Sequence, residues 1–177
     1  MNIKKKLLDY ELPIRTQQDF PIKGVEFIDI TPFITDYKIY NDIINNFVSH
    51  LEDMKIDYIV SPEARGFLFG CSVANKLNCG FIPSRKINKF PSDFIEKSFS
   101  YIKEYGEDSM CLPKLYEQSY KGKNFYIIDD VYATGNTAKA IEETIIELGG
   151  NFIGTGVLLN IASLNDSKDL FSVIDVD

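Results

Sequence analysis

Residues 125–137 read FYIIDDVYATGNT and join an apolar run, two adjacent acids and a loop of small residues. The run 125–128 is short, aromatic and β-branched, which is typical of a strand buried on both faces. From Ala138 onward apolar residues recur at helical spacing, so a helix is expected to follow the loop. In open α/β sheets ligands bind where a strand ends, and the free N–H groups of a helix start favour an anion. The stretch therefore predicts a phosphate site in residues 133–137.

The two acids that precede this loop indicate what accompanies the phosphate. Asp129 and Asp130 would repel a phosphate placed directly on them. They are suited instead to accept hydrogen bonds from neutral hydroxyls, such as those of ribose, or to interact with a metal ion beside the anion. Both alternatives remain open at this point, and either one makes a sugar phosphate the expected ligand.

The same block resembles the phosphoribosyl pyrophosphate (PRPP) signature of type I phosphoribosyltransferases. Within that family, Asp-Asp followed by Ala-Thr-Gly-x-Thr is similar to the adenine-specific members. The resemblance implies that the acid pair holds the ribose hydroxyls and that the loop binds the 5′-phosphate through Ala133, Thr134, Gly135, Asn136 and Thr137. Asn136 stands where glycine is usual. Asparagine tolerates the left-handed conformation better than most residues and keeps its backbone N–H, so we expect phosphate binding to be retained.

Two further segments resemble the parts of the family that contact pyrophosphate. Residues 61–70, SPEARGFLFG, resemble the pyrophosphate loop and make Ala64 and Arg65 candidate contacts. A guanidinium at a strand-to-helix turn can bind an anion in bidentate fashion.

The second of these segments is the predicted strand 81–85, which is expected to bring Arg85 and Lys86 to the same end of the sheet. The resemblance assigns both residues to the departing pyrophosphate, with Lys89 as a further candidate.

Residues 86–112 resemble the mobile lid of these enzymes. Residues 87–100 are polar and interrupted, and 101–106, YIKEYG, resemble the tail of the lid. Residues 99–105 and 108–112 are expected to pair as a hairpin. Glu104 matches the glutamate of the lid tail, which implies that it exchanges a proton with adenine N7 as a catalytic residue beside Arg65 and Arg85.

The N-terminal segment resembles the family's base pocket, inside a small hood of about residues 1–33. The relevant stretch is 19–32, DFPIKGVEFIDITP. An aromatic face suits a flat heterocycle, and Phe27 occupies the position whose ring stacks on the purine. The backbones of Glu26 and Ile28 are expected to hydrogen-bond the adenine edge.

Composition is typical of one soluble enzyme domain spanning residues 1–177, with 45% hydrophobic and 25% charged residues. The net charge of −7 argues against a general nucleic-acid surface. Two of the three arginines fall in the proposed pyrophosphate contacts, and Mg²⁺ carried by the substrate, with Asp129 and Asp130 as candidate ligands, would neutralise further charge. Three unpaired cysteines, no signal-like start and no apolar run of about 18 residues predict a cytoplasmic protein without a membrane partner.

The predicted elements alternate between strands and helices, which include a helical stripe over 40–51 and a strand over 151–161. This order predicts an α/β fold with a mostly parallel sheet flanked by helices, to which the resemblance adds the hood, the hairpin lid and a homodimer. The reaction it implies joins adenine to PRPP and gives AMP and pyrophosphate. Two alternatives stay open: transfer to another purine base, and a non-catalytic PRPP-sensing regulator. A receiver domain with clustered aspartates would give the loop after Asp130 no role.

Overall fold

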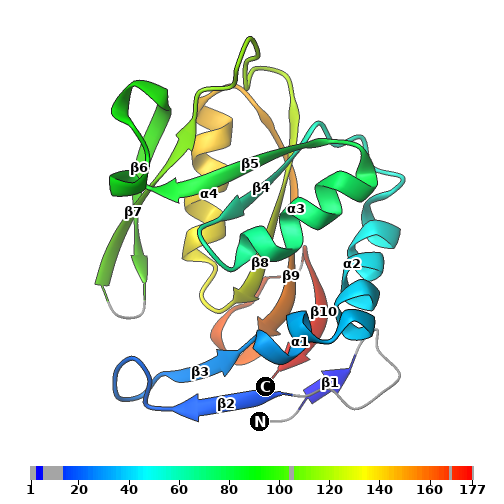
Figure 1. Cartoon of the computed structure of the whole chain (residues 1–177). Coiled ribbons are helices and arrows are strands. Elements are labelled where there is room, and N and C mark those ends of the chain that lie inside the picture. The colour runs from blue at the N-terminus through cyan, green and yellow to red at the C-terminus, as the bar shows by residue number, and fades with distance from the viewer. Residues whose placement is uncertain (1–2, 6–13, 104–105, 168, 177) are drawn as a thin grey trace.

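The computed structural model describes residues 3–5, 14–103, 106–167 and 169–176. Strands and helices alternate along most of this chain (Figure 1). The strands are β1 (Ile3–Lys5), β2 (Arg15–Gln18), β3 (Glu26–Asp29), β4 (Tyr58–Pro62), β5 (Gly80–Lys86), β6 (Ile95–Lys103), β7 (Gly106–Pro113), β8 (Asn124–Tyr132), β9 (Asn151–Ile161) and β10 (Leu170–Val176). The α-helices are α1 (Thr31–Thr35), α2 (Tyr37–Leu51), α3 (Gly66–Leu77) and α4 (Asn136–Glu147), and short 3₁₀ turns are η1 (Ile87–Lys89), η2 (Ser92–Phe94) and η3 (Ala162–Leu164).

One large sheet organises the described part of the chain, in the order β1-β10-β9-β8-β4-β5-β7-β6. The central pairings from β10 through β5 are parallel, whereas β1, β7 and β6 join in antiparallel fashion. Strands β2 and β3 form a separate antiparallel pair near the carboxyl end of β8. The prediction of a mostly parallel sheet flanked by helices is confirmed.

Helices cover both faces of the sheet, and β8 shows the reason in its sequence. Tyr126 and Ile128 pack into a core with α2 and α3, whereas Phe125 and Ile127 pack with Ile141 and Ile145 of α4. Successive side chains of a strand point to opposite faces, so a run of apolar residues without alternation fits a strand covered on both sides.

One predicted boundary moves because of the strand that lies beside it. β8 runs past the predicted 125–128 to Tyr132, since its pairing with β9 continues through Val131 with Leu159 and Tyr132 with Asn160. Just before β4, the Asp57 carboxylate accepts a hydrogen bond from the Asn124 N–H at 2.8 Å and links this turn to the start of β8. The predicted strand 151–161 and the helical stripe over 40–51 are confirmed as β9 and α2.

Regular secondary structure begins before Ser100 in the segment 87–100, which is polar and interrupted in sequence. Residues 87–94 contain η1 and η2, and β6 already begins at Ile95, where it pairs with Pro113 of β7. Further along, Phe99 faces Met110 and Tyr101 faces Asp108. The expected hairpin is therefore present and longer than predicted, because antiparallel pairing holds polar residues that have no apolar pattern of their own.

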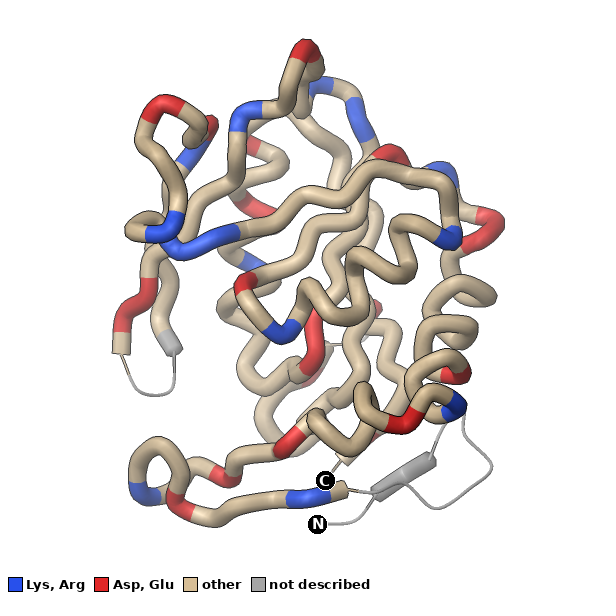
Figure 2. The backbone as a smooth tube through the Cα atoms, in the orientation of Figure 1, with Lys and Arg blue, Asp and Glu red and all other residues tan. Residues whose placement is uncertain are grey.

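Charged residues are distributed along the described part of the chain, as Figure 2 shows, and two consecutive basic residues, Arg85 and Lys86, mark the end of β5. Among the described residues, no helix combines the length and apolar character that a bilayer crossing demands.

Candidate active site

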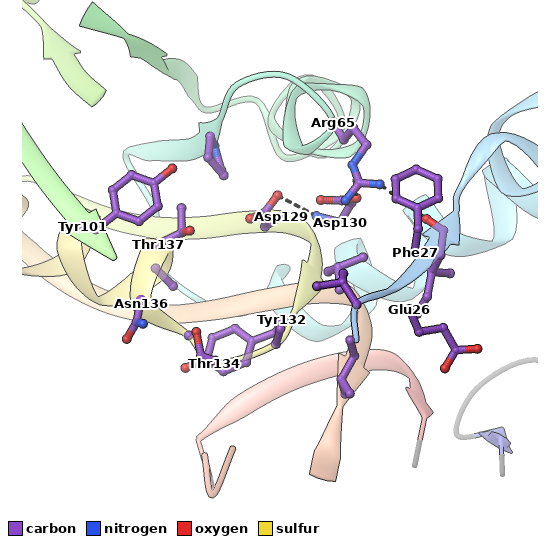
Figure 3. Close-up of a pocket in the computed structure, with 18 of the residues that line it drawn as sticks. Glu26, Phe27, Arg65, Tyr101, Asp129, Asp130, Tyr132, Thr134, Asn136 and Thr137 are labelled. Carbon is purple, nitrogen blue, oxygen red and sulfur yellow. Dashed lines mark hydrogen bonds and ion pairs between the residues drawn. The ribbon is translucent and has the colours of Figure 1, made fainter. Parts of the chain in front are cut away.

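A cavity of about 420 Å³ lies at the carboxyl ends of β4 and β8. Its walls come from the turn before β3 and β3 itself, the β4–α3 turn, the end of β6 and the β8–α4 connection (Figure 3). Segments far apart in the sequence therefore meet at the edge of the sheet where α/β proteins bind ligands.

The β8–α4 loop forms one wall of this cavity, and all five of its predicted phosphate contacts, Ala133 to Thr137, line it. Gly135 has φ +77°, a left-handed conformation that favours glycine, and α4 starts at the next residue. The first N–H groups of an α-helix have no acceptor within the helix, so this turn offers donors to an anion. Asn165 donates to the Ala133 carbonyl at 2.9 Å and holds the start of the loop.

Asn136 does not need the left-handed conformation that we expected it to tolerate. Gly135 adopts it, and Asn136 is the first residue of α4. Its backbone N–H therefore lies in the open first turn of the helix, and its side-chain amide donates to the Ile102 carbonyl of β6 at 2.9 Å.

The acid pair lies beside this loop with one acid held and the other accessible. Asp130 is 5% exposed, and Nε of Arg65 lies 2.7 Å from its Oδ2. Asp129 is half-buried and accepts the Asp130 N–H at 2.8 Å. Burial first, and then the neighbouring Asp130 charge, raise the pKa of Asp129 well above its usual range, while Arg65 acts in the opposite direction. A carboxyl held in this way is stabilised by hydroxyl donors or by a cation.

Gly66 lets helix α3 approach these acids closely. A Cβ at this position would lie 2.9 Å from Oδ1 of Asp129 and 3.2 Å from the Ile128 carbonyl oxygen. The glycine that follows Arg65 thus fixes the distance between the β4–α3 turn and the acid pair.

The base-pocket candidates lie on the opposite wall. The Phe27 ring meets Phe20 edge to face at 5.2 Å, and the Arg65 guanidinium carbon lies 5.5 Å from the Phe27 ring centroid. Arg65 Nη1 also donates to the Ile28 carbonyl at 3.4 Å, while the Ile28 side chain is buried in the core. Figure 3 shows the Glu26 side chain pointing away from the aspartates, so its backbone is the part that faces the cavity.

The pyrophosphate candidates divide into two groups. Ala64 and Arg65 line the cavity, whereas Arg85, Lys86 and Lys89 are not part of its wall. Arg85 Nε lies 3.4 Å from Oε2 of Glu63, and Lys86 Nζ lies 3.3 Å from Oδ2 of Asp108. β5 brings Arg85 and Lys86 to the expected edge of the sheet, where carboxylates of the same chain pair with them, and Lys89 lies in η1 just beyond the strand.

Glu104 lies outside the described residues, so its role stays a prediction. The described part of the chain holds no cluster of three or more His, Cys, Asp or Glu side chains arranged around a metal site. The carboxylate oxygens of Asp129 and Asp130 are nevertheless the hard donors that Mg²⁺ prefers. An ion that shares its coordination with the substrate fits this donor set.

Sequence reasoning did not name several residues that line the cavity, among them Phe20, Glu63, Tyr101, Ile102 and Tyr132. A Cβ on Gly135 would clash with the Tyr132 hydroxyl, so this ring packs against the turn of the loop. Tyr132 stands inside the quoted motif, and its place two residues after Asp130 could have indicated it. Residues 101–106 were expected to form the tail of the lid, but Tyr101 and Ile102 were not singled out, because only the pairing of β6 with β7 shows which residues of the hairpin reach the cavity.

Comparison with known proteins agrees with this geometry. Residues 34–174 match the phosphoribosyl transferase domain family. The adenine phosphoribosyltransferase of Clostridium beijerinckii is 40% identical over 169 residues, covering 96% of this chain and 95% of that protein. The adenine phosphoribosyltransferase of Streptococcus thermophilus is 44% identical over 160 residues, covering 90% and 89%.

Solved structures give the same result. The adenine phosphoribosyltransferase of Thermoanaerobacter pseudethanolicus superposes with a TM-score of 0.83 at 39% identity, over 92% of this chain and 95% of that one. The Saccharomyces cerevisiae enzyme, solved as a complex with adenine and an imino-altritol bisphosphate, has a TM-score of 0.78 at 33% identity, over 92% and 94%. On the evidence of its sequence, its fold and its cavity, the chain belongs to the phosphoribosyl transferase family and, within it, to the adenine phosphoribosyltransferases.

Proposed function

We propose that this chain transfers the phosphoribosyl group of PRPP to adenine and releases AMP and pyrophosphate, a purine-salvage reaction. The observation that carries the proposal is a single cavity lined by the acid pair, the loop 133–137, Arg65 and Phe27. These groups suit, in turn, a sugar diol, a phosphate, a second anion and a flat base. The relatives named above are adenine phosphoribosyltransferases, and the Saccharomyces cerevisiae structure holds adenine.

In the proposed reaction, adenine N9 attacks C1′ of the ribose while pyrophosphate leaves from the opposite face. The protein must position two substrates, stabilise the departing charge and handle one proton. Phe27 would stack on the base, while the backbones of Glu26 and Ile28 would contact its edge. Asp129 and Asp130 would fix the ribose, and the loop 133–137 would hold the 5′-phosphate.

Charge on the departing pyrophosphate would be met by Arg65 with the Ala64 backbone, and by Arg85, Lys86 and Lys89. The last three lie outside the cavity wall and would have to move toward it. Arg85 and Lys86 would also have to leave the carboxylates with which they pair. Mg²⁺ bound with PRPP would neutralise part of the substrate's charge, with Asp129 and Asp130 as its protein ligands. Glu104 is proposed to exchange the proton at adenine N7, a role worth about 10² to 10⁴ in rate.

Other properties follow from family membership as proposals of the same kind. We propose a homodimer of cytoplasmic location whose partners are small molecules, namely PRPP, adenine, AMP and pyrophosphate, and neither nucleic acid nor membrane. Light scattering of the purified protein would test the dimer.

The experiment that tests the function is a product assay. The protein is incubated with PRPP, Mg²⁺ and each of adenine, hypoxanthine, guanine and xanthine in turn, and nucleotides are separated by chromatography. We expect AMP from adenine at a rate that exceeds the other products by at least about tenfold. A dominant product from another base would make the chain a different purine transferase. Tight PRPP binding with no product from any base would make it a PRPP sensor.

A further inference from the structure

Asn136 connects two parts of the cavity that come from distant segments. Its backbone forms the first turn of α4, where the N–H groups have no acceptor within the helix. Its side-chain amide leaves the helix and donates to the Ile102 carbonyl of β6 at 2.9 Å. Asn136 and Ile102 both line the cavity.

The acceptor belongs to a strand that needs such a partner. β6 is the last strand of the sheet within the described chain, so the backbone groups on its outer side have no neighbouring strand. The Asn136 amide satisfies one of these groups at the end of β6 that reaches the cavity.

The rest of β6 runs along α4, with the strand and the helix antiparallel. At the far end of the helix, Lys97 pairs with Glu147 at 3.0 Å, and between the two ends the buried Tyr101 packs with Ala140. The eleven residue-to-residue steps of α4 from Asn136 to Glu147 rise about 16 Å. The five steps of β6 from Lys97 to Ile102 also extend about 16 Å. Strand and helix therefore match in length, and the Asn136 contact fixes the end beside the phosphate loop.

We propose that Asn136 is a positioning residue whose side chain holds the Tyr101–Ile102 wall of the cavity against the loop that binds the 5′-phosphate. One residue then serves two purposes: its main chain contributes to the anion site, and its amide sets the position of the β6–β7 hairpin. Phosphate binding that orders the start of α4 also orders the end of β6. The kinetic part of this inference rests on the proposed function.

Three variants test the proposal. Asn136→Ala removes the amide and keeps the backbone N–H, and Asn136→Gln restores an amide one methylene further out. Glu147→Gln is the matched control, because it releases the far end of β6 from an exposed ion pair that does not touch the cavity. Hydrogen exchange of β6 is measured by mass spectrometry with and without AMP, together with kcat and KM for PRPP and adenine.

We expect Asn136→Ala to speed exchange of residues 100–103 by about 3- to 10-fold, to leave 95–99 unchanged and to weaken the protection that AMP gives to β6. It should lower kcat by about 3- to 10-fold with less than a twofold change in AMP affinity, and Asn136→Gln should recover part of both losses. Glu147→Gln should affect only residues 95–99 and leave kcat unchanged.

The proposal is overturned if Asn136→Ala matches the wild type in exchange and in kcat, or if Glu147→Gln lowers kcat equally. A wild-type protein that forms no AMP would instead remove the proposed function. The exchange comparison without ligand would still decide whether Asn136 holds β6.

Discussion

The two regions proposed to bind the anionic groups of PRPP differ in how completely they are assembled. Around the β8–α4 connection, the loop 133–137 lines the cavity, Gly135 supplies its turn and Asn165 holds its first carbonyl. At the end of β5, by contrast, Arg85 and Lys86 lie outside the wall and pair with Glu63 and Asp108.

This difference indicates two separate tasks. A phosphate that stays on the ribose throughout the reaction suits a preformed site, which avoids the cost of ordering a loop on binding. A pyrophosphate that arrives and leaves suits cations that can exchange their carboxylate partners for phosphate oxygens and return to them. The comparison therefore predicts large losses from changes around Arg65 and the loop, and small or opposite effects from changes to the internal ion pairs of β5.

The largest effect is expected from Arg65→Ala. Arg65 contacts Asp130, the Ile28 carbonyl and the Phe27 ring at once, so its removal leaves a buried carboxylate without its cation and opens the base pocket. We expect kcat/KM for PRPP to fall by about 10² to 10³. Arg65→Lys keeps the charge without the planar fork and should recover only part of the loss. A decrease below tenfold for Arg65→Ala would remove Arg65 from the centre of the account.

A smaller effect is expected from the hydroxyls of the loop. Thr134→Ala and Thr137→Ala should each weaken PRPP binding by about 1 to 3 kcal/mol, the range for a hydrogen bond to a charged group. Isothermal titration calorimetry measures the change. Thr35→Ala serves as the control, because that hydroxyl donates within α1 and lies outside the cavity wall. Equal affinity in all three variants would show that the Thr134 and Thr137 hydroxyls do not contact the phosphate.

The internal ion pair at β5 gives the third test, and here the two partners should act in opposite directions. Arg85→Ala should weaken PRPP by roughly tenfold, since a charged contact to pyrophosphate is lost. Glu63→Gln should tighten it by up to about fivefold, because partly exposed pairs contribute about 0 to 1 kcal/mol and the Glu63 carboxylate, which lines the cavity, would repel a bound anion.

The double variant Glu63→Gln/Arg85→Ala separates the gain from freeing Arg85 from the gain from removing the Glu63 charge. The first gain should be absent in the double variant, because Arg85 is missing there. Weaker PRPP binding by Glu63→Gln would show that the Glu63 pairing supports the site rather than competing with the substrate.

The smallest effect concerns stability rather than binding. The raised pKa of Asp129 means that the folded protein binds this proton more tightly than the unfolded chain does. Its contribution to stability is therefore present at low pH and declines as the pH rises above the ordinary aspartate value of 3.8. Asp129→Asn removes the titration, so its melting temperature should exceed that of the wild type at neutral pH, by about 2–4 °C for each kcal/mol gained.

Melting both proteins over a range of pH serves as the control, because only the loss of the Asp129 titration makes their stability difference depend on pH. The difference between the two melting curves should shrink toward pH 4, while AMP formation by Asp129→Asn is lost at every pH. A variant that melts below the wild type at pH 7 would contradict the direction of the shift.

The same comparison explains how much the sequence could predict. The β8 run, the acid pair, the loop and the start of α4 are consecutive in the chain, so local pattern was sufficient to predict that they adjoin. The position of β5 was predicted as well, and Arg85 and Lys86 do reach its carboxyl end. Their pairing with Glu63 and Asp108 was not predicted, because it depends on how β4 and β7 lie beside β5.

Long-range pairing also explains the other differences. β8 continues through two acids because β9 supplies its hydrogen bonds, and no apolar pattern marks that extension. The side-chain role of Asn136 depends on an edge strand 34 residues away in the sequence. The left-handed conformation was expected at Asn136, whereas Gly135, one residue earlier, adopts it.

The central claim is that the β8–α4 loop holds the 5′-phosphate while the acid pair holds the ribose. A crystal structure of the protein with AMP tests it most directly. The account predicts the phosphate within hydrogen-bonding distance of the backbone N–H groups of residues 133–137, with the ribose hydroxyls on Asp129 and Asp130. AMP bound elsewhere, with this turn filled by protein side chains, would contradict it.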